Sequence, residues 1–539
     1  MGNNISYQTA PIELSLGSRG TIRGTQYDHK SRRYAGVPYA LPPTGEHRWR
    51  KPRPLPEDYA YESADGSPYD ATDFKPVCPQ KLFAKVAKAE GEQVQYSEDC
   101  LFLNIWTPVP KDGERGRQWP VVLWLHGGWF AMGDPSQKPG MDPTELISTG
   151  GLNAVFVAIG YRLNVFGFLA GSAVLEDNDG EAAGNFGLWD QRLAMQWVQE
   201  NIHHFGGDPG NVTLGGRSAG AYAAQAQVLH EFRSDDGESS DKLFRRFYMI
   251  SNAIPAQPKT VSESELQFDE VCTHFKVLPK LSGEEKVSRL RQIPSQDLVA
   301  ALQHLQHHTF RPITDDLFLH SGMIDYLRDG HFAAEFQRRD MRLLIGEVLN
   351  EETLYAEYHS PSAPKRDALS RQIENYYAAA TVERILPHYE LPLTSDLQDW
   401  KALYGNIVAD GQVRAPSRYF VKQLFDYGIP LEKIWRYQIA YRLSFITDKV
   451  APKFFGVAHA MDRPFWNFSI THGLTPQERI LMRDWIQILV AFVHEDDSYV
   501  LGTKLIDEMK VATPDGRIEV LKDDRWDTLT RLGEAFARG

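Results

Sequence analysis

Short apolar runs recur along the chain and are separated by longer segments with helical spacing. Residues 121–125, 154–159 and 247–251 are continuous or nearly continuous apolar runs, and residues 343–346 and 434–440 repeat the pattern. Runs of this length without apolar–polar alternation are typical of strands that are covered on both faces. They predict buried strands of a parallel sheet.

Between these runs lie segments with the spacing of amphipathic helices. Over residues 189–202 apolar side chains recur four positions apart, an Ala-rich helix is predicted over 221–229, and a late helix is predicted over 478–492. Strands that alternate with helices indicate an α/β fold with helices on both faces of a mostly parallel sheet.

Two stretches, at about 260–340 and 355–430, are rich in charge and helical pattern and poor in apolar runs. The length of 539 residues would allow several domains. Neither a repeat nor a Gly/Ser-rich linker marks a boundary, however. We therefore expect one domain over residues 1–539, with the two stretches as helical insertions above the site.

Composition excludes several classes of function. The chain is 42% hydrophobic and 24% charged, which is ordinary for a globular protein, and its formal net charge of −13 disfavours a nucleic-acid partner. We expect no membrane span, because no apolar stretch approaches about 18 residues. Residues 1–16 lack the apolar core of a signal peptide, so we expect a cytoplasmic protein; secretion with the signal removed is the alternative. We expect a monomer or a homodimer.

The most informative motif is Gly216-Arg217-Ser218-Ala219-Gly220, between an apolar run and the Ala-rich helix. Strand, Gly-x-Ser-x-Gly and helix form the context of a nucleophile elbow, in which glycines allow the sharp turn. Ser218 is therefore a candidate nucleophile. A plain Gly-rich turn is the alternative.

A second motif, His126-Gly127-Gly128-Trp129-Phe130, directly follows the apolar run 121–125. Backbone N–H groups on such a loop can stabilise the oxyanion of an acyl-transfer intermediate, since missing side chains let the substrate approach. A common Gly turn after a strand is the alternative. The position upstream of the elbow favours an oxyanion hole.

With these motifs the chain resembles the type-B carboxylesterases, the cholinesterase-like branch of the α/β-hydrolases. The matching blocks keep the family's order and are Tyr34–Ala40, Ser97–Asn104, Tyr161–Leu163, Gly167–Leu169, Gly184–Leu188 and Phe205–Pro209. The resemblance implies an α/β-hydrolase fold and a serine esterase that needs no metal and no cofactor.

The resemblance also implies the other members of a catalytic triad. In the family the acid lies five residues after a glycine that ends a strand, which here places it at Glu351. Glu347 and Glu352 are close enough to leave this choice open. The histidine is His459, within a stretch that resembles the family's Gly-x-x-His-x-x-Glu/Asp loop.

Three positions depart from the family's pattern. Arg217 stands where a glutamate is usual, Trp129 replaces the third glycine of the oxyanion loop, and Ala223 stands where a second serine is frequent. The backbone N–H survives at Trp129, so the resemblance still implies an oxyanion hole made by Gly128, Trp129 and Ala219.

Arg217, Phe130 and Tyr222 are the candidates for substrate binding. Arg217 either pairs with a carboxylate inside the fold or faces the substrate and favours anionic or carbonyl-rich esters. Aromatic residues near the motifs favour an apolar or aromatic ester, although core packing explains most of them equally well.

Three cysteines are present. The resemblance implies a disulfide between Cys78 and Cys100, and two reduced, buried thiols are the alternative that a cytosolic protein would favour. Cys272 has no evident partner and is expected to be a free thiol.

We expect hydrolysis of a small carboxylic ester through an acyl-enzyme. The same triad could perform acyl transfer, or form or open a lactone. A non-catalytic, cholinesterase-like binding protein is the alternative from a different class, and the intact triad argues against it.

Overall fold

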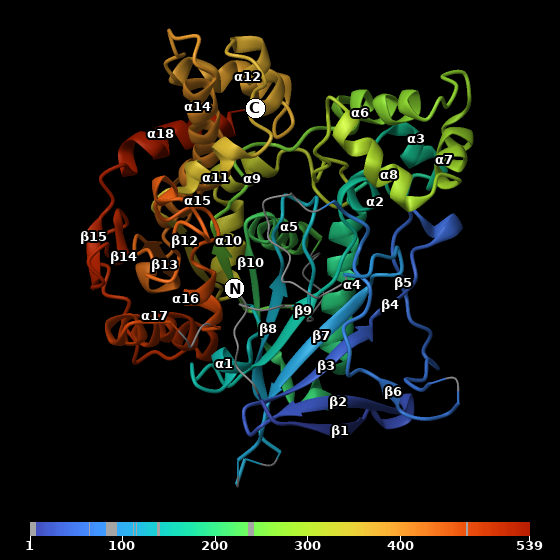
Figure 1. Ribbon diagram of the computed structural model, residues 1–539, viewed down its shortest axis with the longest axis vertical. Coiled ribbons are helices and arrows are strands. Elements are labelled where there is room, and N and C mark those ends of the chain that lie inside the picture. The colour runs from blue at the N-terminus through green and yellow to red at the C-terminus, as the bar shows by residue number, and fades with distance from the viewer. Residues whose placement is uncertain are drawn as a thin grey trace. The chain divides into compact units, whose positions relative to one another are not determined.

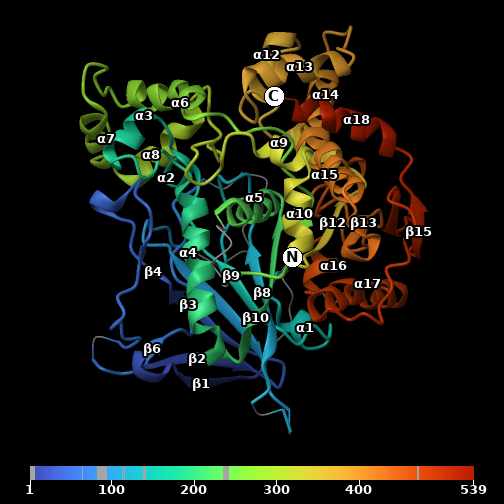
Figure 2. The same ribbon diagram turned by 180° about the vertical axis from the view of Figure 1, so that it is seen from behind.

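The computed structural model describes residues 7–63, 65–81, 94–111, 113–114, 116–136, 141–234, 242–469 and 473–538. The chain forms two compact units (Figures 1 and 2). The first unit comprises residues 1–215, 237–245 and 260–319, and the second comprises residues 216–236, 246–259 and 320–539. Whether the chain is one domain stays a prediction.

The strands of the first unit lie in the order β1-β2-β3-β7-β9-β8-β10, with β6 beside β2 and a separate pair β4-β5. The last two residues of β10, Gly216 and Arg217, belong to the second unit. Their bounds are β1 Thr9–Ser15, β2 Thr21–Tyr27, β3 Ser31–Pro38, β4 Ala40–Leu41, β5 Arg53–Pro54, β6 Tyr69–Asp70, β7 Phe102–Pro108, β8 Trp119–Leu125, β9 Val155–Ile159 and β10 Gly207–Arg217. β8 and β9 run parallel, whereas β1, β2, β3, β7 and β9 form antiparallel neighbours.

Every residue of β8 and β9 is buried, as their continuous apolar sequences predict. The helices of the first unit are α1 Thr144–Ile147, α2 Asn164–Phe168, α3 Ser172–Asp177, α4 Phe186–Asn201, α6 Val261–His274, α7 Gly283–Arg291 and α8 Ser295–Ala301. α4, which confirms the helix predicted over 189–202, runs along one face of these strands (Figures 1 and 2).

The second unit contains the parallel neighbours β11, β12, β13 and β14, and β15 pairs antiparallel with β14. Their bounds are β11 Arg246–Ile250, β12 Arg342–Val348, β13 Ile434–Ile439, β14 Glu508–Ala512 and β15 Ile518–Lys522. The strands predicted over 247–251, 343–346 and 434–440 are therefore confirmed.

The helices of the second unit include α5, which continues from the Ser218 turn, and the late helix α17. Their bounds are α5 Ala219–Ser234, α9 Met323–Arg328, α10 His331–Arg338, α11 Glu351–Glu357, α12 Arg366–Ile373, α13 Ala379–Ile385, α14 Leu397–Ala409, α15 Ala415–Asp426, α16 Arg463–Asn467, α17 Pro476–His494 and α18 Trp526–Ala537. A π-helix, η6 (Asp410–Arg414), joins α14 to α15. The stretches 260–340 and 355–430 are helical and contain no strand in these described ranges, as their patterns predict.

The sequence patterns did not reveal the antiparallel strands at the edges. In β1 no residue is fully buried, and the same holds for β15. Edge strands that face solvent carry no continuous apolar run, so their sequences do not stand out from those of loops. Among the described residues, no helix is both long and apolar enough to cross a lipid bilayer.

Candidate active site

Ser218 lies in a strained turn between β10 and α5. Its φ is +56°, a left-handed conformation that is uncommon for a residue with a side chain. A Cβ atom on Gly216 would lie 2.2 Å from the carbonyl oxygen of Gly220, so only glycine fits there. The backbone N–H of Ser218 donates to the carbonyl of Ile250 at 2.8 Å. This is the geometry that the Gly-x-Ser-x-Gly motif predicts for a nucleophile elbow.

Glu351 begins α11, directly after the loop that follows β12. Both of its carboxylate oxygens accept hydrogen bonds: Oε1 accepts from the backbone N–H of Val348 at 2.9 Å, and Oε2 lies 2.5 Å from Nδ1 of His459. Glu351 is 0% exposed and His459 is 5% exposed. A carboxylate at Nδ1 favours the tautomer with the proton on Nδ1, which leaves Nε2 as a proton acceptor.

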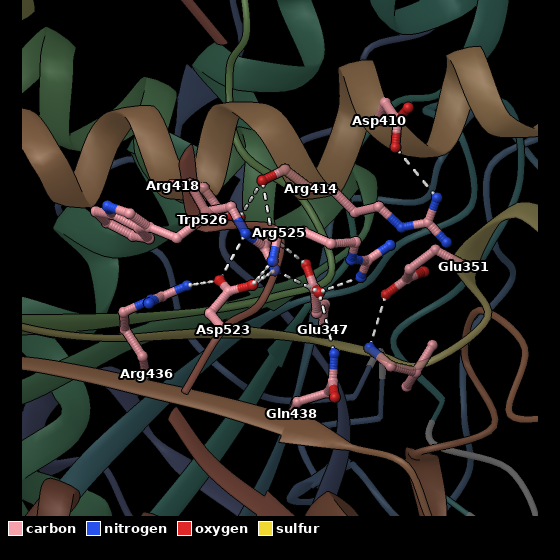
Figure 3. A network of polar contacts seen from close by, with 12 residues as sticks. Glu347, Glu351, Asp410, Arg414, Arg418, Arg436, Gln438, Asp523, Arg525 and Trp526 are labelled. Atoms are coloured by element: carbon pink, nitrogen blue, oxygen red, sulfur yellow. Dashed lines mark hydrogen bonds and ion pairs between the residues drawn. The ribbon is translucent and has the colours of Figure 1, made fainter. Parts of the chain in front are cut away.

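The structure distinguishes Glu351 from its two neighbouring glutamates. The carboxylate of Glu352 pairs with the guanidinium of Arg414, and that of Glu347 pairs with Arg418. Figure 3 shows Glu347 and Glu351 in their separate surroundings. Glu351 is therefore the glutamate of these three that contacts His459, as the family's spacing implies.

Glu347 belongs to a buried network of charges. Arg418 donates to both oxygens of Glu347 at 2.8 and 2.9 Å and to Asp523 at 2.7 Å, and Arg436 donates to Asp523 at 2.7 Å (Figure 3). Burial raises the pKa of Glu347, but the guanidinium groups of Arg418, Arg525 and Arg414 together outweigh it and lower that pKa to about 2. The network attaches β12, which leads to Glu351, to the segment before α18.

Asn350 fixes the loop that carries His459. Its backbone N–H donates to the carbonyl of Val457 at 3.0 Å, and its side-chain oxygen accepts from the N–H of Val457 at 3.1 Å. Gly456 has φ +59°, and a Cβ atom there would lie 2.1 Å from Oδ1 of Asn350. No sequence motif marked this contact between Asn350 and Val457.

Arg442 holds the segment that leads into the same loop. Its guanidinium donates to the carbonyls of Ala451 and Gly456, both at 2.6 Å, and also to that of Ile446 at 3.1 and 3.2 Å. A planar fork of five N–H groups suits several carbonyls at once. No sequence motif marked Arg442.

Arg217 is turned into the fold. Its side chain is 4% exposed, and Nη1 lies 3.6 Å from Oδ1 of Asp462, which is 0% exposed. Burial lowers the pKa of Arg217, and Asp462 partly offsets this effect. Of the two alternatives for Arg217, the contact with a carboxylate inside the fold is the one that the structure contains.

The loop with the predicted oxyanion residues belongs to the first unit. Gly128 has φ +123°, and a Cβ atom on it would lie 2.1 Å from the carbonyl oxygen of Met132. Trp129 and Phe130 also have positive φ values, +58° and +60°. Gln80 braces the end of the loop, since it accepts from the N–H of Gly133 at 2.7 Å and donates to its carbonyl at 2.8 Å.

The two aromatic candidates for substrate binding are packed into the fold. The ring of Phe130 is fully buried and lies 4.9 Å from that of Phe168, and Tyr222 on α5 is 4% exposed. Gly128, Trp129 and Phe130 lie in the first unit, whereas Ala219 and Tyr222 lie in the second. Their roles in substrate binding and in an oxyanion hole stay predictions.

The predicted disulfide is not formed. Cys78, Cys100 and Cys272 are free thiols, and all three are buried. Sγ of Cys78 accepts a hydrogen bond from the backbone N–H of Leu163 at 3.3 Å. Contact with the Cys78 side chain, together with burial, raises the pKa of the Cys100 thiol. The two cysteines are thus buried side by side without a bond, which corrects the expectation of a Cys78–Cys100 disulfide.

Within the described ranges, no group of three His, Cys, Asp or Glu side chains is placed to hold a metal ion. Ser218 and the contacting pair His459–Glu351 all lie in the second unit. Residues of these three types are the ones that nucleophilic acyl transfer uses, and their roles here stay predictions.

Comparisons with known proteins agree with this chemistry. The model of the carboxylesterase family matches residues 8–528. An uncharacterized esterase/lipase of Schizosaccharomyces pombe is 35% identical over 98% of this chain and 97% of its own. A carboxylic ester hydrolase of Gibberella moniliformis is 35% identical over 97% of this chain and 95% of its own, and an acetylcholinesterase of Bungarus fasciatus is 29% identical over 87% and 76%. The chain therefore belongs to the carboxylesterase family of α/β-hydrolases and is a carboxylic ester hydrolase.

Proposed function

We propose that the protein cleaves esters of small, uncharged, apolar or aromatic molecules through an acyl-enzyme on Ser218. The contact between Glu351 and His459, 2.5 Å long and buried, is the observation that carries this proposal. It supports a role for His459 as a base at Nε2, in the unit that also presents the strained Ser218.

In the first half of the reaction, Oγ of Ser218 attacks the ester carbonyl carbon while Nε2 of His459 takes the hydroxyl proton. The tetrahedral intermediate collapses, and the imidazolium gives that proton to the departing alkoxide. In the second half, His459 takes a proton from water, the hydroxide attacks the acyl carbon, and Ser218 leaves with the proton returned to it. The products are an alcohol and a carboxylic acid.

Glu351 holds the imidazole in one tautomer and stabilises the imidazolium that forms in each half-reaction. The N–H of Ala219, at the start of α5, is a proposed donor to the oxyanion. Gly128 and Trp129 are proposed as the further donors, on the resemblance alone.

The proposed preference for uncharged substrates rests on Arg217. Its guanidinium is buried and paired with Asp462, which supports a site that offers no free charge beside the nucleophile. We expect poor activity on choline esters, because the residue before Ser218 is a cation and not a carboxylate. Three buried, reduced cysteines support the proposal that the protein works in a reducing compartment such as the cytoplasm.

A panel of p-nitrophenyl and aryl esters with graded acyl length, with choline esters alongside, tests the substrate class. A serine-reactive phosphonate followed by peptide mass spectrometry tests the nucleophile. We expect label on Ser218 and a loss of at least about 1000-fold in kcat for Ser218→Ala.

Ser251→Ala is a matched control. Ser251 is also buried and has φ +54°, so the substitution shares the backbone context of Ser218→Ala. We expect Ser251→Ala to keep the phosphonate label on Ser218 and to retain turnover. Full turnover in Ser218→Ala, or label on another serine, would refute the proposed nucleophile.

A further inference from the structure

Arg217 and Asp462 join the two backbone segments that carry the proposed nucleophile and base. Arg217 immediately precedes Ser218, and Asp462 follows His459 by three residues. The two side chains lie 3.6 Å apart and are 4% and 0% exposed. A contact between residues 245 positions apart (462 − 217) thus connects the Ser218 turn to the His459 loop.

Both partners have fixed backbones. Arg217 is the last residue of β10, and the Ser218 N–H that follows is bonded to Ile250. The carbonyl of Asp462 accepts from the N–H of Phe465 at 3.0 Å and so begins α16. The ion pair therefore joins two backbone segments that regular structure holds in place. A shift of one segment would move the other.

We propose that the Arg217–Asp462 ion pair is a positioning bridge that sets His459 relative to Ser218 and balances the charge of a second carboxylate beside the base. This inference rests on the proposed function, because it concerns the same serine and histidine. Arg217 and Asp462 are positioning residues, and neither transfers a proton in the proposed reaction.

The need for a counter-charge follows from the surroundings of Asp462. Neither of its carboxylate oxygens has a hydrogen-bond partner among the residues that the structure describes. Burial raises the pKa of Asp462, Arg217 is the largest influence that lowers it, and Glu351 and His459 also act on it. Removing one member of such a pair leaves an uncompensated buried charge.

Tyrosines from two strands of the sheet also act on the pair. Tyr437 on β13 and Tyr248 on β11 face Arg217, and burial raises the pKa of each above its usual range. Both phenols are therefore neutral at working pH. The charged groups that act on the pair are Glu351 and, when protonated, His459, besides Arg217 and Asp462 themselves.

Without Arg217, two carboxylates would act on His459 with no cation beside them, which favours the imidazolium in the resting enzyme. His459 would then stay protonated, and unable to act as a base, up to a higher pH. Without Asp462, the unbalanced Arg217 would disfavour the imidazolium and have the opposite effect. The two single substitutions therefore shift the acidic limb of the pH–rate profile in opposite directions.

The experiment measures kcat and KM for a p-nitrophenyl ester from pH 5 to 9, with thermal unfolding alongside. The variants are Arg217→Gln, Asp462→Asn, the double substitution, and Arg217→Lys as the control that keeps the charge. We expect the acidic midpoint of log(kcat/KM) to rise by about half a pH unit to one unit in Arg217→Gln and to fall by a similar amount in Asp462→Asn.

In the double variant we expect the wild-type midpoint, since both charges are gone, but a kcat reduced about 10-fold or more with KM within threefold, since the bridge is lost. Arg217→Lys should keep the midpoint. Midpoints that do not move, or that move in one direction in both single variants, overturn the charge-balance role. A double variant with wild-type kcat overturns the positioning role, even where the single variants fail to fold.

Ser218→Ala, measured in parallel, separates this inference from the proposed function. If Ser218→Ala retains turnover, the proposed function fails. If turnover depends on Ser218 while the bridge variants behave as wild type, the bridge alone is refuted.

Discussion

Replacing Glu351 with glutamine exchanges one carboxylate oxygen for an NH2 group at a fully buried position. Oε1 accepts from the N–H of Val348 and Oε2 contacts Nδ1 of His459, so the amide can satisfy only one of the two. If its oxygen stays with Val348, its NH2 faces Nδ1 and the imidazole adopts the tautomer whose Nε2 is already protonated. That tautomer cannot accept the proton of Ser218.

If the amide turns round, its NH2 faces the N–H of Val348 and a buried donor is left without an acceptor, which costs about 1–3 kcal/mol. The imidazolium also loses a charged partner, and a hydrogen bond to a charged group contributes about 1.5–3 kcal/mol. The sum is about 2.5–6 kcal/mol, so we expect kcat to fall by about 10²- to 10⁴-fold.

Glu352→Gln is the matched control, because its carboxylate is one residue away and pairs with Arg414 instead. We expect Glu352→Gln to lower kcat by less than about 10-fold. The assay is ester turnover at saturating substrate, with circular dichroism to verify folding. A folded Glu351→Gln enzyme that keeps more than a tenth of the wild-type kcat would refute the reasoning, as would a larger loss in Glu352→Gln.

Glu347, with its pKa lowered to about 2, stabilises the fold above pH 4.5 by on the order of 3 kcal/mol, and this contribution should be lost as the pH falls from 4.5 towards 2. Urea unfolding across that range should show that the free energies of unfolding of wild type and Glu347→Gln converge. Gly456→Ala places a Cβ atom 2.1 Å from Oδ1 of Asn350 and should lower kcat by about 10- to 100-fold, whereas Gly428→Ala, also at positive φ but with no atom within 4 Å, should not. Thiol titration of the denatured, unreduced protein should find all three cysteines free, and a value of one would restore the disulfide.

Much of the fold could be predicted because the buried parallel strands leave a strong signal. β8, β9 and β11 are buried throughout, so nearly every residue in them is apolar. β1 and β15 lie at edges and have no fully buried residue, so their sequences resemble loops. The patterns that identify a core cannot identify an edge.

The site was predictable where chemistry dictates local spacing and not where it depends on distant contacts. The turn around Ser218 needs small residues at fixed offsets, and these are visible in the sequence. The partner of Arg217, the bonds from Asn350 to Val457 and the carbonyls held by Arg442 join segments that only the fold brings together. The disulfide prediction failed because a shared cysteine pattern does not determine the oxidation state.

During synthesis, Arg418 and Arg436 leave the ribosome 105 and 87 residues before Asp523, the carboxylate that both contact. Until Asp523 emerges, Arg418 has only Glu347 of its two carboxylate partners, and Arg436 cannot be buried beside the carboxylate that balances its charge. The strand that leads to Glu351 therefore receives its full support only near the end of translation. We therefore expect an mRNA with a premature stop codon before position 523 to yield a misfolded chain that chaperones bind and proteases degrade, and not a shortened, active esterase.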